Sequence, residues 1–177
     1  DLMTLGKYLG GGFSVGAFGG RRDVMELFDP GRPGAIGHAG TFNNNTMTMT
    51  VGLTAITEIY TEDEAARLSA LGDEFRARMN DAFAGRGLPF VVSGRGSMNV
   101  LHPQAVAPTR PSELAGDSDL RELVFLGLLE RGIYIAPRGM INLSVIHGLD
   151  HLETLANELL DVCEGLRDLA VGDQRTR

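Results

Sequence analysis

Lys7 is the only lysine among the 177 residues, and every other strongly basic side chain is an arginine. Arginine can serve salt bridges, solubility and phosphate contacts, but its guanidinium stays protonated and cannot act as an amine nucleophile. A lysine amine can lose its proton when it is desolvated or lies near positive charge, and it can then attack an aldehyde to form a Schiff base. Lys7 is therefore a candidate catalytic amine. The alternative is an arginine-rich chain that has kept one surface lysine.

Glycines gather around Lys7, since 11 of the 24 glycines fall in the first 40 residues. Such clustering marks turns and close backbone approaches, so we expect loops and short strands there. A cradle for a nucleotide phosphate is the alternative. However, no Lys-Ser or Lys-Thr pair follows a GxxxxG spacing, and no GxGxxG arrangement opens a helix.

Arg138 is a second candidate for a functional side chain. It lies in Ala136-Pro137-Arg138-Gly139, between two apolar runs, where a rigid turn could hold a guanidinium fork in a cleft. The paired donors of arginine match a carboxylate. A surface or interdomain salt bridge is the alternative role.

The other reactive side chains give weaker signals. His38 lies in a glycine-rich loop, where a lone histidine usually makes local hydrogen bonds, so we assign it no catalytic role. His102, His147 and His151 lack a cysteine or carboxylate arrangement suited to a metal, and no metal site is predicted. Cys163 lies on an apolar helix face and is expected in the core, and a single cysteine excludes an intrachain disulfide.

Two segments resemble class III aminotransferases, in the order that this family has. Thr4-Leu5-Gly6-Lys7-Tyr8-Leu9-Gly10-Gly11-Gly12, with the glycine-rich stretch that continues to Asp23, is similar to the cofactor-lysine segment of the family. Gly40-Thr41-Phe42-Asn43-Asn44-Asn45 resembles its glycine-threonine segment, which precedes a helix. The chain departs from the family pattern at Thr46, where members usually have a proline. The resemblance covers Asp1 to about Ala170.

This resemblance implies an enzyme that uses pyridoxal 5′-phosphate (PLP). In the family the lysine amine bonds PLP, is displaced by the substrate amine, and then moves the proton between the substrate carbon and the cofactor, so Lys7 would do both. Gly40 and Thr41 would bind the phosphate of the neighbouring subunit's PLP in a homodimer, with help from the dipole of the following helix. Arg138 would bind the substrate carboxylate, in a context that resembles enzymes handling β-amino acids.

The elements that position these residues follow from periodicity and helix caps. Asparagines 43–45 offer caps, and the apolar spacing that follows predicts a helix over about 45–59. Thr61-Glu62-Asp63-Glu64 has the pattern of a capping box, so a helix begins there and ends at Gly85 to Gly87. The remaining predicted elements are strands over 90–93 and 97–102, a helix through 120–128, strands over 133–135 and 140–145, and a helix with a capping pattern at Asp150.

The expected fold class is α/β, the PLP-dependent transferase fold (fold type I). Residues 1–60 would be the carboxy-terminal part of the large PLP-binding domain, 61–170 a small α/β domain, and 171–177 a disordered tail. The chain lacks a starting methionine and the upstream residues that bind PLP in the family, namely a phosphate loop, a ring-stacking aromatic residue and an aspartate. We therefore expect a fragment that is inactive by itself and binds PLP weakly.

The composition narrows the class of function. Hydrophobic residues make up 43% of the chain, which indicates a globular protein, and the net charge of -7 with a pI near 5.0 gives no general attraction to nucleic acid or membranes. We expect no nucleic-acid or membrane partner and a cytoplasmic location. The predicted function is transfer of an amino group between an amino acid, possibly a β-amino acid, and a keto acid. The alternatives are glutamate-1-semialdehyde 2,1-aminomutase and, in another class, a noncatalytic assembly module.

Overall fold

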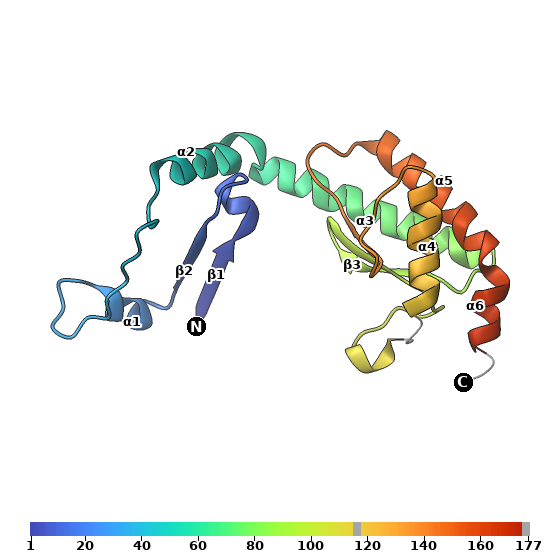
Figure 1. Ribbon diagram of the computed structural model, residues 1–177, viewed down its shortest axis with the longest axis horizontal. Helices are drawn as coiled ribbons and strands as arrows, with labels where there is room; N and C mark the ends of the chain where they lie inside the picture. Colours follow the sequence, from blue (N-terminus) through green and yellow to red (C-terminus); the bar gives the residue numbers. More distant parts are fainter. Residues whose placement is uncertain (115–117, 175–177) are drawn as a thin grey trace. The chain divides into compact units, whose positions relative to one another are not determined.

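The computed structural model describes residues 1–114 and 118–174 of the chain (Figure 1). Its contacts divide the chain into two units, Asp1–Glu62 and Asp63–Arg177. The division falls at the start of the long helix α3 (Glu62–Gly85), where the capping pattern predicts a helix start. The assignment of the two parts to a large and a small domain stays a prediction.

The first unit begins with a β-hairpin. Strand β1 (Leu2–Gly6) pairs antiparallel with β2 (Gly16–Gly20), and Gly6 faces Gly16 at the closed end of the pair. The 3-10 helix η1 (Lys7–Gly10) and a glycine-rich loop connect the strands. The glycine-rich region therefore forms loops and short strands, as the sequence predicts. Two short helices follow β2: α1 (Arg22–Met25) and η2 (Glu26–Phe28).

A helix in two parts completes the first unit. Helix α2 (Thr46–Thr54) continues directly into the π-helical turn η3 (Ala55–Ile59), so the helix predicted over 45–59 is confirmed. Asn45 is its N-cap, because its side chain accepts a hydrogen bond of 3.2 Å from the backbone N–H of Thr48. Thr46 is the first helical residue, where a proline also fits because its missing N–H would have no helical partner.

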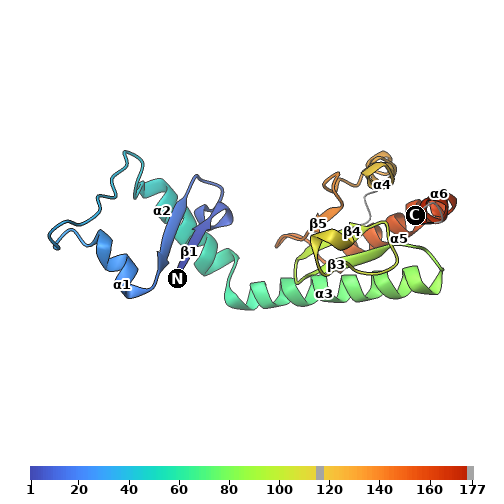
Figure 2. The same cartoon turned by 90° about the horizontal axis from the view of Figure 1, so that it is seen from below.

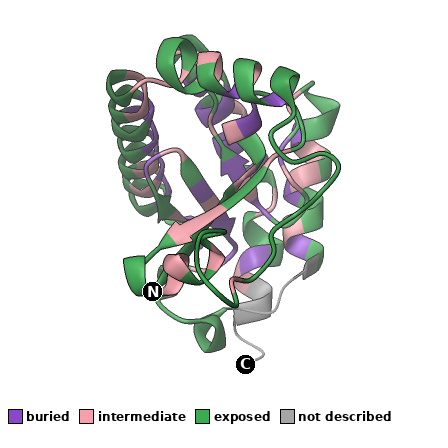
Figure 3. Ribbon diagram, turned by 90° about the vertical axis from the view of Figure 1, so that its left-hand side faces the viewer, coloured by how far each residue is buried: buried purple, intermediate pink, exposed green. Residues whose placement is uncertain are grey.

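Most apolar side chains of the first unit are exposed (Figure 3). Its buried residues are Gly10, Thr48 and Gly52, all at the contact between η1 and α2 or within α2. The exposed large side chains are Leu2, Met3, Leu5, Tyr8, Phe13, Leu27, Ile36, Phe42, Met47, Met49, Leu53, Ile56 and Ile59. Apolar exposure of this extent is typical of surfaces that contact other protein.

The second unit packs helices on a small antiparallel sheet. The strands are β3 (Val91–Arg95), β4 (Met98–His102) and β5 (Met140–Asn142), in the order β3-β4-β5. Helix α3 runs alongside this sheet (Figure 2). The other elements are the 3-10 helix η4 (Pro111–Glu113), α4 (Ser118–Glu130), α5 (Leu149–Gly165) and α6 (Arg167–Gln174).

The core of the second unit lies between these helices and the strands. The apolar stripe predicted on α3 is confirmed, because Leu68, Leu71, Phe75, Met79 and Phe83 are all buried. The largest apolar side chains that are fully buried beside them are Leu101, Leu128, Leu159, Val92 and Val124. Burying one such side chain contributes about 1.5–3 kcal/mol. The second unit therefore has a core of its own.

Four predictions about the second unit need correction or completion. Residues 133–135 are not a strand, and only 140–142 of the predicted strand over 140–145 pairs with β4. Helix α5 starts at Leu149 with Gly148 as its N-cap, and the cap comes from the ring of His151, whose Nδ1 accepts from the Gly148 N–H at 3.2 Å. Asp150 is therefore not the cap. Helix α6 extends to Gln174 within the segment predicted to be a disordered tail, and residues 175–177 lie outside the described part.

In the ranges 1–114 and 118–174, no helix is long and apolar enough to cross a bilayer.

Candidate functional site

Lys7 is the first residue of η1, at the point where the chain leaves β1. Its φ of +58° is in the left-handed region, which a residue with a β-carbon rarely adopts. Such backbone conformations cost about 1–3 kcal/mol and gather at functional sites. The side chain is exposed, and within the described ranges its amine has no hydrogen-bond or ion-pair partner. Lys7 is therefore a strained residue with an unengaged primary amine.

Helix α2 holds the Lys7 turn by close backbone contact. A β-carbon on Gly52 of α2 would lie 2.6 Å from the backbone oxygen of Leu9, and one on Gly11 would lie 2.8 Å from the backbone oxygen of Val51. Real side chains do not tolerate such distances, so glycine is required at both positions. Gly11 also adopts a φ of +58° and donates its N–H to the carbonyl of Tyr8 at 2.9 Å, which closes the turn.

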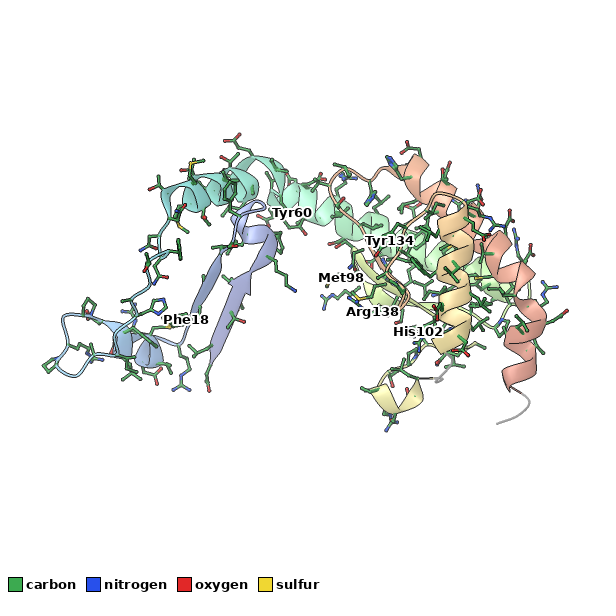
Figure 4. All side chains as sticks on the ribbon, viewed as in Figure 1. Phe18, Tyr60, Met98, His102, Tyr134 and Arg138 are labelled. Atoms are coloured by element: carbon green, nitrogen blue, oxygen red, sulfur yellow. The ribbon has the colours of Figure 1, made fainter. Side chains whose placement is uncertain are left out.

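Tyr8 connects the same turn to the end of the two-part helix. Its ring lies against that of Tyr60, the residue after η3, with centroids 5.4 Å apart and planes at 65°. Figure 4 labels Tyr60. This edge-to-face arrangement is a favoured geometry for aromatic pairs. The turn therefore contacts the helix at two places, through glycines in the middle and through tyrosines at the end.

Arg21 ties the open end of the hairpin. Its guanidinium donates to the carboxylate of Asp1 at 2.9 Å and also to that of Asp23 in α1. The hydrogen bond from Arg21 holds the pKa of the Asp23 carboxyl below its usual range. All three side chains are exposed, so this ion pair is worth little in stability.

The glycine-threonine segment forms a turn that leads into α2. The backbone N–H of Asn43 donates to the carbonyl of Gly40 at 3.0 Å, and Asn44 has a φ of +55°. Thr41 is exposed. Because α2 begins only at Thr46, Thr41 lies outside its first turn, where the effect of the helix dipole falls off. The dipole is therefore a weaker support for an anion at Thr41 than the sequence suggests, whereas the hydroxyl makes no hydrogen bond to any residue that the structure describes.

His38 lies edge-on to two phenylalanines in this unit, at 5.1 Å from the ring of Phe18 and 6.3 Å from that of Phe28. These rings line an open cavity of about 820 Å³ that also reaches Gly16 and Asn44. His38 thus makes ring contacts and no hydrogen bond among the described residues, and its lack of a catalytic role stays a prediction. Lys7 and Thr41 are not among the residues that line this cavity.

Arg138 lies in a tight turn of the second unit, between residues 133–135 and β5. The N–H of Gly139 donates to the carbonyl of Ala136 at 2.8 Å, and the carbonyl of Gly139 accepts from the N–H of Leu101 on β4 at the same distance. Gly139 has a φ of +86°, so this position favours glycine. The guanidinium is exposed, and its Nε lies 2.9 Å from the sulfur of Met140. Arg138 therefore extends from a rigid backbone without an acidic partner in the described ranges.

The structure brings Lys7, Gly40 and Thr41 into one unit and Arg138 into the other. No hydrogen bond joins Lys7 to Thr41 among the described residues. The described residues also contain no group of three or more His, Cys, Asp or Glu that could hold a metal. Cys163 is buried, as predicted, and burial raises the pKa of its thiol.

Sequence reasoning missed Tyr8, Gly11, Gly52 and Tyr60 as neighbours of the candidate amine. The spacing of Gly52 and Tyr60 on one helix was visible, but nothing in it indicates which loop they contact. The positive φ of Lys7 had no signal either, since lysine has no preference for that conformation.

The fold is that of PLP-dependent aminotransferases. The solved β-phenylalanine aminotransferase from Variovorax paradoxus superimposes with a TM-score of 0.89 at 41% identity, covering 94% of this chain and 39% of that one. The family model for class-III aminotransferases matches residues 1–169. The chain therefore belongs to the class-III aminotransferase family, whose cofactor is PLP. The fold class expected from the sequence is confirmed.

Two curated relatives bear on the substrate. The chain is 47% identical over 146 residues to a β-phenylalanine transaminase of Variovorax paradoxus, covering 82% of this chain and 33% of the relative. It is 41% identical over 139 residues to a glutamate-1-semialdehyde 2,1-aminomutase of Opitutus terrae, covering 77% and 32%. The chain thus spans about a third of the length of these relatives.

Proposed function

We propose that the complete protein is a PLP-dependent aminotransferase that moves an amino group between an amino acid and a keto acid, with Lys7 as its catalytic amine. The observation that carries this proposal is the state of Lys7, the sole lysine of the chain, strained and with a free amine, in a chain of the class-III family. Residues 1–60 are assigned to the large cofactor domain and 61–170 to the small domain. A single, buried cysteine fits the proposed cytoplasmic location.

The residues of the chain fit PLP by their chemistry. The aldehyde of the cofactor needs a primary amine that no carboxylate engages, and Lys7 supplies one. Bound PLP supplies an electron sink that stabilises negative charge on the substrate carbon. The Nζ of Lys7 would hold the cofactor, and after the substrate amine has displaced it, the same atom would carry the proton between the substrate carbon and the cofactor.

Gly40 and Thr41 are proposed to bind the phosphate of the neighbouring subunit's PLP in a homodimer. Thr41 has an exposed hydroxyl that makes no hydrogen bond in the described part of the chain, and it lies within the turn that the Asn43 N–H closes on the Gly40 carbonyl. A hydroxyl and backbone amides are neutral hydrogen-bond donors, and such donors suit the charged oxygens of a phosphate. The exposed apolar side chains of the first unit are consistent with a partner subunit on that surface.

Arg138 is proposed to bind the substrate carboxylate. Its turn is held to β4 by the hydrogen bond to Leu101, and its fork has no acidic partner among the described residues. A rigid backbone lowers the entropy lost when the fork binds a carboxylate in two places. The identity to a β-phenylalanine transaminase favours a β-amino acid as the amino donor.

The second candidate is glutamate-1-semialdehyde 2,1-aminomutase, favoured by the 41% identity to such an enzyme. Both reactions use the same lysine, so Lys7 does not distinguish them. Supplying the protein with glutamate-1-semialdehyde, and separately with β-phenylalanine plus 2-oxoglutarate, does. Turnover of the first substrate alone would replace our choice by the aminomutase.

The proposed role of Lys7 is tested by covalent capture. The protein is expressed from its complete reading frame, incubated with PLP and reduced with borohydride. The mass of the peptide that contains Lys7 is then measured by mass spectrometry. We expect one PLP per subunit on that peptide and none in a Lys7→Arg variant, which keeps the charge but lacks the amine nucleophile. Absence of PLP on the Lys7 peptide refutes the proposal and favours the noncatalytic assembly module.

A further inference from the structure

The edge-to-face pair of Tyr8 and Tyr60 joins the candidate amine to the end of the helix. Tyr8 is the residue after Lys7, it is 68% exposed, and its ring contacts that of Tyr60. We propose that Tyr60 is a positioning residue for Lys7. The ring of Tyr60 holds Tyr8 in place, and Tyr8 in turn holds the turn that orients the lysine amine. This inference rests on the proposed function of Lys7.

Lys7 needs such support because its backbone is strained. A lysine at a φ of +58° returns to a commoner conformation unless the surrounding structure prevents it. Rotation about this φ would redirect the side chain relative to β1, which ends at the residue before. The turn is closed by the Gly11 N–H on the Tyr8 carbonyl, so the position of Tyr8 determines that of the turn. A contact that holds Tyr8 therefore restrains the backbone of the turn from which the Lys7 side chain extends.

The π-helical turn η3 is what directs Tyr60 toward Tyr8. The N–H of Tyr60 donates at 2.7 Å to the carbonyl of Ala55, five residues back, instead of the residue four back as in an α-helix. One additional residue in the turn rotates everything after it by about 100° around the helix axis. In an uninterrupted α-helix the ring of Tyr60 would therefore point away from Tyr8. π-turns are frequent at functional sites.

A threonine side chain accompanies the change of helix type. The hydroxyl of Thr57 donates to the carbonyl of Leu53 at 2.8 Å, one turn back. Back-bonding of this kind competes with the regular backbone ladder and bends helices. This hydrogen bond comes from a residue within the π-turn, and the effect of the turn is the placement of one aromatic ring.

The size of the effect follows from the geometry of the pair. An edge-to-face aromatic pair contributes beyond its buried area by an amount that corresponds to about a two- to tenfold change in an equilibrium or rate. Phenylalanine at position 60 keeps the ring and its edge. Leucine keeps apolar bulk but has no ring, so it removes the pair with little change in volume.

The test compares Tyr60→Leu with Tyr60→Phe in the protein made from its complete reading frame. The rate of PLP capture at Lys7 is measured by quenching with borohydride at intervals and weighing the Lys7 peptide. We expect capture about two- to tenfold slower in Tyr60→Leu and unchanged in Tyr60→Phe. Tyr134→Leu is the matched control, because it removes a similar pair in the other unit, with Phe125 at 5.8 Å and 87°, and should capture PLP at the unaltered rate.

A second readout separates positioning from general stability. The pH midpoint of the visible absorbance of PLP held on Lys7 reports the surroundings of that amine, and we expect it to move in Tyr60→Leu and to return in Tyr60→Phe. Since the effect runs through Tyr8, Tyr8→Leu and the double variant should match Tyr60→Leu. Additive effects in the double variant would overturn the inference.

The outcomes distinguish this inference from the function beneath it. No capture by the unaltered protein refutes the proposed function itself. If Tyr60→Leu and the unaltered protein have the same rate of PLP capture and the same pH midpoint of absorbance, only the positioning role is refuted. If Tyr60→Leu does not fold, Tyr8→Leu carries the comparison, because Tyr8 is largely exposed, and an unchanged capture rate in that variant is equally decisive.

Discussion

Replacing Gly52 with alanine tests how tightly α2 holds the turn of Lys7. The new β-carbon would lie 2.6 Å from the backbone oxygen of Leu9. Since atoms in ordinary contact lie about 3.5 Å apart, the turn and the helix would have to separate by about 0.9 Å. The oxygen belongs to the backbone of η1, so no side chain can rotate to relieve the clash. The Lys7 turn itself must move.

Two effects oppose each other in the stability of Gly52→Ala. Alanine is a better helix former than glycine by about 1 kcal/mol in a helix interior. Overpacking against a backbone atom costs about 1–3 kcal/mol. We expect the clash to win, with a net loss of up to about 2 kcal/mol in the free energy of unfolding. If Lys7 is the catalytic amine as proposed, a displacement near 1 Å should also lower the reaction rate by about 100-fold.

In the complete protein, urea unfolding measures the change in stability, and the rate of PLP capture at Lys7 measures the effect of displacing the amine. Gly85→Ala is the control, because a β-carbon on Gly85, at the end of α3, would meet no atom within 4 Å. The control should match the unaltered protein or exceed it slightly in stability. Should Gly52→Ala be stabilised by about 1 kcal/mol and capture PLP at the unaltered rate, helix propensity alone governs this position and the argument for a clamped turn is wrong.

Three further predictions concern stability and use urea unfolding. Burial is the main cause that lowers the pKa of His102, and the charge of Arg121 lowers it further. The unfolded chain therefore binds the proton more readily than the folded one, so the free energy of unfolding should fall as the pH drops below about 6.5. His102→Gln should lose this slope, and an unchanged slope contradicts the assignment. Asn80→Ala removes hydrogen bonds of 2.8 and 3.0 Å to the backbone of Val92 on the outer edge of β3, and should cost about 1–3 kcal/mol; a neutral result means that water replaces them. Asn45→Ala removes the cap of α2 and should cost about 1 kcal/mol, whereas Asn45→Asp should retain stability; equal losses in both exclude capping as the cause.

The sequence predicted those elements whose signals are local. The apolar spacing after Asn45 and the capping pattern at Thr61 predict helices where α2 and α3 begin, because caps and helical periodicity lie within a few residues of each other. Residues 133–135 are two β-branched isoleucines around a tyrosine, all favourable in strands, yet they form no strand, because a strand also needs a partner that the local sequence does not contain.

The candidate site was predictable in its chemistry and not in its geometry. The uniqueness of Lys7 and the family motifs indicate the candidate residues, since only a lysine side chain supplies a primary amine. The strain at Lys7, the close approach of Gly52 and the ring contact of Tyr60 depend on how the hairpin meets the helix. The change from α to π at Ala55 had no signal in the apolar spacing, because one shifted turn leaves the spacing before it intact.

Helix α2 has a consequence for communication between subunits. It starts directly after the asparagine that ends the Thr41 segment, and its side presses on the backbone of the Lys7 turn. In the proposed homodimer, helix α2 would thus support the phosphate site for the neighbouring subunit's cofactor and also orient the amine that binds the cofactor of its own subunit. Binding of PLP at the first cofactor site would make the second site more rigid. The dimer should therefore bind its two cofactors with positive cooperativity.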